Sequence, residues 1–403
     1  MSKILAFLFL PLALFGANIE LGVDQFFAHQ QPLIAKKRVG LITNHTGVDS
    51  NLEPTWKRLH ETGRLVALFS PEHGLSGAAR AFESIPHSKN KNGVRIYSLH
   101  GETRRPTKEM LQGIDLLIFD IQEIGCRSYT YISTLFYAME EAAKYKIPVI
   151  VLDRPNPMGG EIVDGPMMNE KMRYFLGYID IPYCHGMTVG ELALFFNKEY
   201  KVGCQLKVIP MKGWKRSMTY QETGLSWIPT SPYIPEPDTP FFYASTGILG
   251  ALSLTSIGIG YPLPFKVVGA PWMDGQLLAE KLNAQKLPGV CFLPFSYRPF
   301  YGKFKNETCS GVKIVITDSK IYRPISVQYM LIGMIKSLYT KEFKERLAKM
   351  SDADKVAFSK VNGSEKILDI LTKEKYCGWK LLEVDKKERA VFLNKRKAYL
   401  LYD

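Results

Sequence analysis

The chain has 403 residues, of which 46% are hydrophobic and 23% are charged, a composition typical of a globular protein with two domains. Its 52 basic and 39 acidic residues give a formal net charge of +13, which favours an anionic partner. The basic residues form no dense run interleaved with aromatic residues, so we expect no nucleic acid among its partners. Acidic glycans or a bacterial envelope are partners that would fit a protein with scattered positive charge.

The first residues have the features of a secretory signal peptide. Lys3 supplies a positive charge, residues 4–15 form an apolar stretch too short to span a bilayer, and residues 16–17 are small. The bulky residues before them weaken the cleavage site, and a buried N-terminal strand or helix is the alternative interpretation. We therefore predict a signal peptide over residues 1–17 and an exported protein, periplasmic or secreted. No later apolar run approaches 18 residues, so we expect no stable membrane insertion after signal removal.

Four short apolar runs in the first part of the chain predict β-strands. They cover residues 38–44, 65–69, 115–120 and 148–153. An amphipathic stretch over 131–145 lies between the third and fourth runs and has the length of a right-handed crossover helix. The pattern predicts an α/β fold with a Rossmann-like, doubly wound and mostly parallel sheet.

Polar residues follow the carboxyl end of each predicted strand, the edge at which open α/β sheets bind ligands. A single such residue is ordinarily a helix cap or a turn former, but four loops of this kind favour an active site. The residues are Asn44, His45, Glu72, His73, Asp120, Glu123, Asp153, Arg154 and Asn156.

Motifs for cofactors and metals do not occur. The turn after the first strand is not GxGxxG, and the chain has no GxxxxGK[ST], GxSxG or HExxH sequence. The six cysteines include no CxxC pair and are most simply buried thiols, although one or two disulfides are possible. We expect neither a cofactor nor a metal site.

Successive segments resemble the exo-β-N-acetylmuramidases, a bacterial envelope family long described only as a domain of unknown function. The resemblance covers nearly the whole chain after residue 17, with its motifs in order. The matching segments are residues 39–47 (VGLITNHTG), 69–74 (FSPEHG), 119–132 (FDIQEIGCRSYTYI), 151–157 (VLDRPNP), 164–166 (DGP), 185–193 (HGMTVGELA), 269–272 (GAPW), 309–312 (CSGV) and 399–402 (YLLY).

The resemblance implies a Rossmann-like catalytic domain over residues 18–250, a smaller α/β auxiliary domain over 251–403 and an active site between them. It also implies hydrolysis of non-reducing-end β-linked N-acetylmuramic acid in cell-wall oligosaccharides. Glu72 is the expected general acid, since it follows Pro71 at a strand end, and a helix N-terminal carboxylate is its structural alternative. Asp120 and Glu123 are the other expected catalytic residues, although Asp120 could instead hold its loop. In substrate-assisted cleavage the acetamido oxygen of the sugar would replace the protein nucleophile, and inversion with a water nucleophile is equally open.

Further residues in the matching loops are expected to bind the substrate. They are Asn44, His73, Arg127, Tyr129, Tyr131, Asp153, Arg154, Asn156 and His185. N-acetylmuramic acid carries a lactyl carboxylate, for which an arginine fork is the strongest partner, so Arg127 and Arg154 are candidates. Each could equally form a salt bridge to Asp120 or Asp153 that fixes the loops.

Several remaining features have mainly structural interpretations. Thr188 and Glu191 form a predicted capping box, so Glu191 is better explained as structural than as catalytic. The proline-rich segment 227–238 is predicted to be a rigid connector that spans the domains or stacks a sugar ring. A strand over 312–317 and a helix over 326–339 are expected in the second domain.

The chain also departs from the family pattern. Many relatives carry an EGTNxSEGRGT cluster before the Pro-Phe that is residues 264–265 here, and Ile257 and Ile259 occupy the places of its Glu and Arg. Tyr233 stands where relatives often have Asn, and Glu123 replaces a more usual Asp. If the missing Glu is essential, the chain is inactive, and if it contacts distal sugar or peptide, the specificity differs. A non-catalytic or altered-specificity glycan-binding protein on the same fold is the alternative function.

Overall fold

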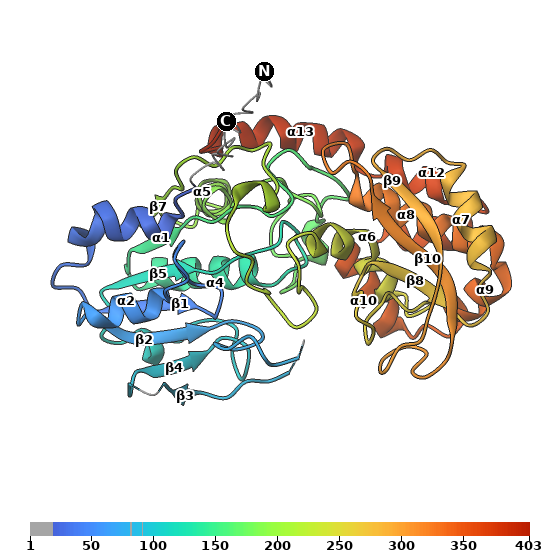
Figure 1. Ribbon diagram of the computed structural model, residues 1–403. Coiled ribbons are helices and arrows are strands. Elements are labelled where there is room, and N and C mark those ends of the chain that lie inside the picture. The colour runs from blue at the N-terminus through green and yellow to red at the C-terminus, as the bar shows by residue number, and fades with distance from the viewer. Residues whose placement is uncertain (1–18, 81–82, 91) are drawn as a thin grey trace, which may run out of the picture.

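The computed structural model describes residues 19–80, 83–90 and 92–403, so the predicted signal peptide lies outside the described residues. Seven strands of the first domain form one sheet, in the order β3-β4-β2-β1-β5-β6-β7 (Figure 1). They are β1 Val39–Thr43, β2 Leu65–Ser70, β3 Ser88–Lys89, β4 Arg95–Ser98, β5 Leu116–Asp120, β6 Val149–Leu152 and β7 Leu206–Ile209. Only β3 and β4 pair antiparallel in this sheet. The four predicted strands are its four central ones, and the predicted mostly parallel α/β sheet is confirmed.

Helices surround this sheet and build most of the second domain. The α-helices are α1 Gly22–Gln25, α2 Thr55–Glu61, α3 Lys108–Leu111, α4 Tyr131–Lys144, α5 Val189–Glu199, α6 Thr239–Ala251, α7 Gly275–Asn283, α8 Pro324–Leu338, α9 Thr340–Ala348, α10 Asp352–Asn362, α11 Lys366–Lys373, α12 Gly378–Glu383 and α13 Lys386–Arg396. Shorter π and 3₁₀ turns are η1 Phe26–Gln30, η2 Gln31–Ile34, η3 Glu170–Met172, η4 Gln221–Thr223 and η5 Lys397–Tyr399.

Both faces of the sheet are covered, because alternate residues of its central strands are apolar on each side. In β5, Leu117 and Phe119 face a core that they share with α4 and α5. Leu116 and Ile118 face the opposite core, to which α1, α2 and η1 contribute. The predicted crossover helix is α4, which connects the parallel neighbours β5 and β6.

The capping box predicted at the start of α5 is confirmed. The Thr188 hydroxyl accepts a hydrogen bond from the Glu191 amide, and the Glu191 carboxylate accepts one from the Thr188 amide at 3.0 Å. Glu191 also forms a buried ion pair with Arg216 at 2.7 Å. Both of its oxygens therefore serve the fold, as the sequence indicated.

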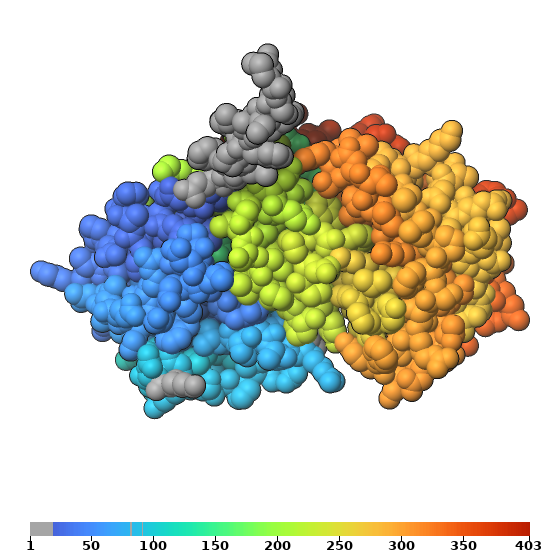
Figure 2. Space-filling view, viewed as in Figure 1, coloured from blue at the N-terminus to red at the C-terminus, as the bar shows by residue number. Residues whose placement is uncertain are grey.

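The second domain has its own antiparallel sheet, in the order β8-β10-β9. Its strands are β8 Val267–Ala270, β9 Val290–Tyr297 and β10 Cys309–Ile316. The predicted strand over 312–317 is β10, and the predicted helix over 326–339 is α8. The sequence analysis did not predict α6, and the predicted domain boundary at residues 250–251 falls in its last turn. In Figure 2 the yellow-green segment before α6 covers the junction between the two domains.

The last helix, α13, returns to the first domain and runs along both (Figure 1). Phe392 packs edge-on against Phe195 of α5, with ring centroids 5.8 Å apart, and Arg396 donates a hydrogen bond to the Gly186 carbonyl at 2.5 Å. These contacts of α13 connect the two domains through a segment distant in the sequence, and they stabilise the junction between the domains.

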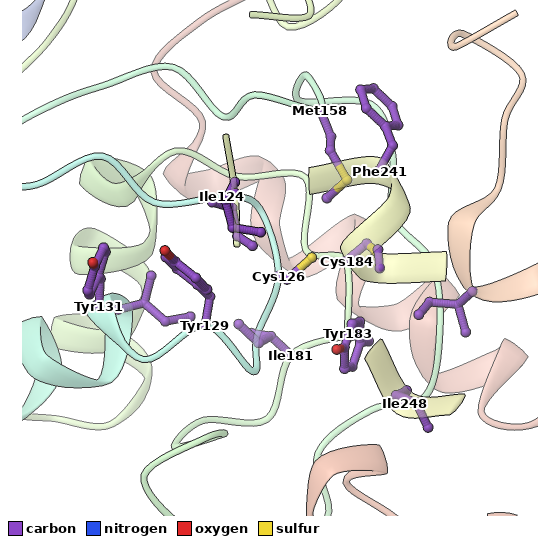
Figure 3. Close-up of a cluster of buried hydrophobic side chains, with 14 of the residues drawn as sticks. Ile124, Cys126, Tyr129, Tyr131, Met158, Ile181, Tyr183, Cys184, Phe241 and Ile248 are labelled. Atoms are coloured by element: carbon purple, nitrogen blue, oxygen red, sulfur yellow. The ribbon is translucent and has the colours of Figure 1, made fainter. Parts of the chain in front are cut away.

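Buried thiols lie in the core at this junction. Figure 3 shows Cys126 and Cys184 side by side among aromatic and aliphatic side chains, and both are free thiols. Burial raises the pKa of Cys184 well above its usual value, so this thiol stays protonated and unreactive.

Among the described residues, no helix combines the length and the apolar character needed to cross a membrane.

Candidate active site

A pocket of about 180 Å³ lies where the two domains meet. Its walls come from the end of β2, the loop before α4, the connector, α6 and the start of the second domain. The lining residues are Glu72, His73, Ser128, Tyr129, Thr130, Leu176, Ser231, Tyr233, Ile234, Tyr243 and Phe265. Glu72 is the only carboxylate among them.

Glu72 is 5% exposed, and its carboxyl group is held by polar neighbours. The Thr130 hydroxyl donates a hydrogen bond to its Oε2 at 2.7 Å, and His100 Nε2 lies 3.7 Å from its Oε1. Burial lowers the pKa of His100, while the charge of Glu72 acts in the opposite direction. Glu72 is therefore a carboxyl group of fixed orientation at the wall of a pocket, which is the arrangement that a proton donor needs.

A tight turn presents Glu72 and His73 to the pocket. The Gly74 amide donates to the Pro71 carbonyl at 3.0 Å, and His73 has a φ of +68°, which is uncommon for a non-glycine residue. His73 Nδ1 is 2.7 Å from the Ala79 carbonyl, so its ring is anchored to the following loop. Backbone strain of this kind is concentrated at functional sites.

Two predicted substrate-binding tyrosines hold the connector against the pocket. Tyr129 and Tyr131 pack edge to face at 4.8 Å, and Figure 3 shows their hydroxyls pointing to the same side. These hydroxyls donate to the side chain and the carbonyl of Thr230 at 2.9 and 2.6 Å. Burial raises the pKa of Tyr129 to about 12, so it stays a neutral donor. Asn44 lies beside Tyr131 and accepts hydrogen bonds from Thr46. The connector is thus a structural element that also supplies pocket residues.

Asp120 and Arg154 form a buried ion pair instead of facing the pocket. Arg154 Nε is 2.6 Å from Asp120 Oδ1, and the Thr55 hydroxyl donates to Oδ2 at 2.5 Å. Arg154 also donates to the Val48 carbonyl at 2.6 Å. Burial disfavours the charge of Arg154, but Asp120 raises its pKa on balance. This is the loop-fixing salt bridge that the sequence left as the alternative, so the geometry supports neither a catalytic Asp120 nor a substrate-binding Arg154.

Glu123, Asn156 and His185 are brought together behind the pocket. Glu123 accepts a hydrogen bond from the Gly125 amide and lies 3.6 Å from His185 Nε2, and both side chains are buried. Asn156 donates to the Met187 carbonyl at 3.0 Å. None of the three lines the pocket, so the predicted catalytic role of Glu123 and the predicted binding roles of Asn156 and His185 lack geometric support.

Asp153 and Arg127 also serve the scaffold. Asp153 accepts hydrogen bonds from the Gly190 amide at 2.7 Å and from the Tyr402 hydroxyl at 2.5 Å, and burial raises its pKa to about 7. Arg127 is fully buried, which lowers its pKa, and it donates to four backbone carbonyls, those of Pro166, Ile181, Val361 and Asn362. The alternative interpretation of Arg127, a salt bridge to Asp120 or Asp153, does not occur among the contacts of the described residues, and its guanidinium does not line the pocket.

The structure adds residues in the pocket, or in contact with Glu72, that the sequence analysis did not single out. Thr130 orients Glu72 and lies inside the long matching segment 119–132, which is the signal that could have revealed it. His100 follows the short strand β4, whose four residues show no continuous apolar run, so the sequence analysis did not predict that strand. Ser128 bridges Tyr183 and Tyr243 through hydroxyl contacts at 2.7 and 3.0 Å. Tyr243 belongs to α6 and so depends on a helix that was not predicted.

The isoleucines that depart from the family pattern pack into the second domain. Ile257 is 9% exposed, and its side chain lies close to Gly250 of α6. Ile259 is partly buried against the same core. Neither lines the pocket beside Glu72, so both lie outside the group that surrounds the candidate acid.

Comparison with known proteins covers most of the described chain. A family model described as exo-beta-N-acetylmuramidase NamZ, N-terminal, matches residues 39–238, and the corresponding C-terminal model matches residues 241–402. The peptidoglycan beta-N-acetylmuramidase NamZ of Bacillus subtilis (strain 168) is 40% identical over 330 residues, which are 81% of this chain and 80% of that protein.

Two solved structures have the same fold, and both are DUF1343 family proteins from Bacteroides fragilis NCTC 9343. BF0371 is 40% identical with a TM-score of 0.90, and the match covers 96% of this chain and 100% of that one. BF0379 is 29% identical with a TM-score of 0.75, and the match covers 96% and 99% of the two chains.

Proposed function

The chain belongs to the exo-β-N-acetylmuramidase family, and from this membership we propose that it is an exo-acting glycoside hydrolase. The proposed reaction removes β-linked N-acetylmuramic acid from the non-reducing ends of peptidoglycan fragments. The observation that carries the proposal is the position of Glu72, an oriented carboxyl group that lines a pocket at the domain junction.

Glu72 is the proposed general acid. Cleavage of a glycosidic bond needs a carboxylic acid that protonates the leaving oxygen. Because Thr130 fixes one oxygen of Glu72 and the pocket excludes most of the solvent, the carboxyl group is held in one orientation toward the bound sugar. His73 lines the same pocket, and His100 Nε2 lies 3.7 Å from Oε1 of Glu72.

The second participant is proposed to come from outside the protein. Asp120 and Glu123 are both engaged behind the pocket, so neither supplies a nucleophile there. That leaves the acetamido oxygen of the substrate to attack the anomeric carbon, because a water nucleophile needs a second carboxylate as its general base. An N-acetylated sugar carries this nucleophile in its own structure.

The size of the pocket supports exo action. A volume of about 180 Å³ lies below the roughly 300–1,000 Å³ of sites that hold drug-sized ligands. Such a pocket suits a single terminal sugar and not the middle of a glycan chain.

The proposed activity predicts release of 4-nitrophenol from its β-N-acetylmuramide by the purified protein, but not from the N-acetylglucosaminide, which lacks the lactyl group. Absorbance of the released phenol measures both rates. Release from neither compound by a folded protein would contradict the hydrolase and favour the glycan-binding alternative, for which the apolar loop at Ile257 and Ile259 would then be the first region to examine.

We also propose that the chain acts outside the cytoplasm, because the pattern of residues 1–17 is that of a secretory signal. Expressed in a bacterium, the protein is expected in the periplasmic or secreted fraction with an N-terminus near residue 18. Mass spectrometry of the fractionated protein measures this. A cytoplasmic protein that retains residues 1–17 would be the contrary result.

A further inference from the structure

The loop between β9 and β10, residues 298–308, carries two exposed aromatic side chains in succession. Phe300 is 66% exposed and Tyr301 is 49% exposed. Large aromatic rings are usually buried on folding because water solvates them poorly. Two neighbouring rings left in solvent on one loop mark a surface that gains free energy when a ligand covers it.

Backbone contacts hold this loop in place. The Phe300 amide donates to the Gly260 carbonyl at 2.7 Å, and the Asn306 amide donates to the Pro299 carbonyl at 2.8 Å. Gly260 has a φ of +88°, and a Cβ there would come within 2.0 Å of the Tyr301 carbonyl oxygen. The aromatic loop therefore rests directly on the segment in which the chain departs from its family pattern.

The aromatic loop is continuous with the pocket of Glu72. The phenol of Tyr301 lies near that of Tyr233, which is itself a wall of the pocket, and this neighbour helps burial to raise the pKa of Tyr301. The positive charge of Arg80 is close enough to act on the Tyr301 phenol, so the loop after β2 lies across from the aromatic loop. Figure 2 shows the light-blue segment after β2 and the orange loop of the second domain as two projections at the lower edge of the molecule.

We propose that Phe300 and Tyr301 form a second sugar-binding subsite, which stacks against the sugar on the leaving-group side of the bond that is cleaved. This inference rests on the proposed function. In the proposed function the pocket holds the terminal residue, and this places the next sugar of the glycan at its mouth. The C–H groups of a pyranose ring give it an apolar face, and an aromatic ring is the surface that such a face covers best. The hydroxyl of Tyr301 adds a polar contact at the rim.

Kinetics with two substrates test the subsite. One is the β-1,4-linked disaccharide of N-acetylmuramic acid and N-acetylglucosamine, and the other is methyl β-N-acetylmuramide, whose leaving group has no ring. Phe300→Ala and Tyr301→Ala are each expected to lower kcat/KM for the disaccharide about threefold to tenfold, the effect of losing one aromatic contact. The methyl glycoside is expected to react at the wild-type rate. Tyr301→Phe keeps the ring and should keep most of the disaccharide activity.

Trp379→Ala is the matched control, because Trp379 is 59% exposed but belongs to α12, far along the second domain. It should change neither substrate. Equal losses on both substrates, or no loss on the disaccharide, would overturn the subsite while leaving the hydrolase intact. Wild-type protein that cleaves neither compound would instead overturn the proposed function, and the subsite with it.

Discussion

Glu72→Gln is expected to lower kcat for the muramic acid disaccharide by about 10²–10⁴-fold, the usual contribution of a general acid. Glutamine has nearly the same shape, and Thr130 can still donate to its carbonyl oxygen, so the pocket should stay formed. The amide has no acidic proton for the leaving sugar. KM for the disaccharide should therefore change little while kcat falls.

The leaving group makes this prediction diagnostic. A 4-nitrophenolate departs without protonation far more readily than a sugar alkoxide. The variant should therefore lose much less activity on the nitrophenyl muramide than on the disaccharide, if Glu72 acts as the acid. Equal losses on the two substrates would assign Glu72 to binding or to the scaffold.

Glu141→Gln is a suitable control, because Glu141 is buried to a similar degree, with 7% exposure, but lies on α4 and pairs with Arg105 and Lys144. It should keep the wild-type kcat. Thermal unfolding of both variants separates loss of chemistry from loss of structure. A Glu72→Gln protein with unchanged stability and full activity on the disaccharide would contradict the proposed mechanism.

Much of the first domain was predictable because its strands carry local signals. Continuous apolar runs such as residues 115–120 are typical of strands buried on both faces, and this run became the central strand β5. The capping box at Thr188 was predictable for the same reason, since a hydroxyl and a carboxylate three residues apart interact within one turn.

The elements that were missed lack such local patterns. The strand β4 has only four residues and lies near the sheet edge, so its burial alternates without a clear apolar run. The helix α6 is apolar on nearly all sides because it is buried between the domains, and it therefore shows no amphipathic period. The burial of α6 depends on tertiary packing, which cannot be inferred from a short stretch of sequence.

The site was only partly predictable because a carboxylate at a strand end can either stabilise the fold or line a pocket. The sequence places Glu72 and Asp120 in equivalent positions, each just after or at the end of a buried strand. Only the fold distinguishes them, since Asp120 forms an ion pair with Arg154 and Glu72 lines a pocket. The same holds for Arg127, whose charge is satisfied by backbone carbonyls contributed from both domains.

Arg154→Met is expected to lower the free energy of unfolding by about 3–5 kcal/mol, the cost of leaving one member of a buried ion pair without its partner. Asp120 is fully buried, and without Arg154 it keeps only the Thr55 hydroxyl on its side chain. The Val48 carbonyl also loses its donor. Urea unfolding monitored by circular dichroism measures the change.

Two further variants make the Arg154 result interpretable. Asp120→Asn combined with Arg154→Met removes the stranded charge, so the double variant should recover part of the loss, as expected for residues in direct contact. Arg38→Met breaks the exposed pair between Arg38 and Asp115 and should change stability little, because water screens that pair. If Arg154 instead bound the lactyl carboxylate, its variant would keep its stability and raise KM for the muramide alone. That outcome would support a substrate-binding role for Arg154. A large loss of stability would instead assign Arg154 to the scaffold that holds the loops behind Glu72.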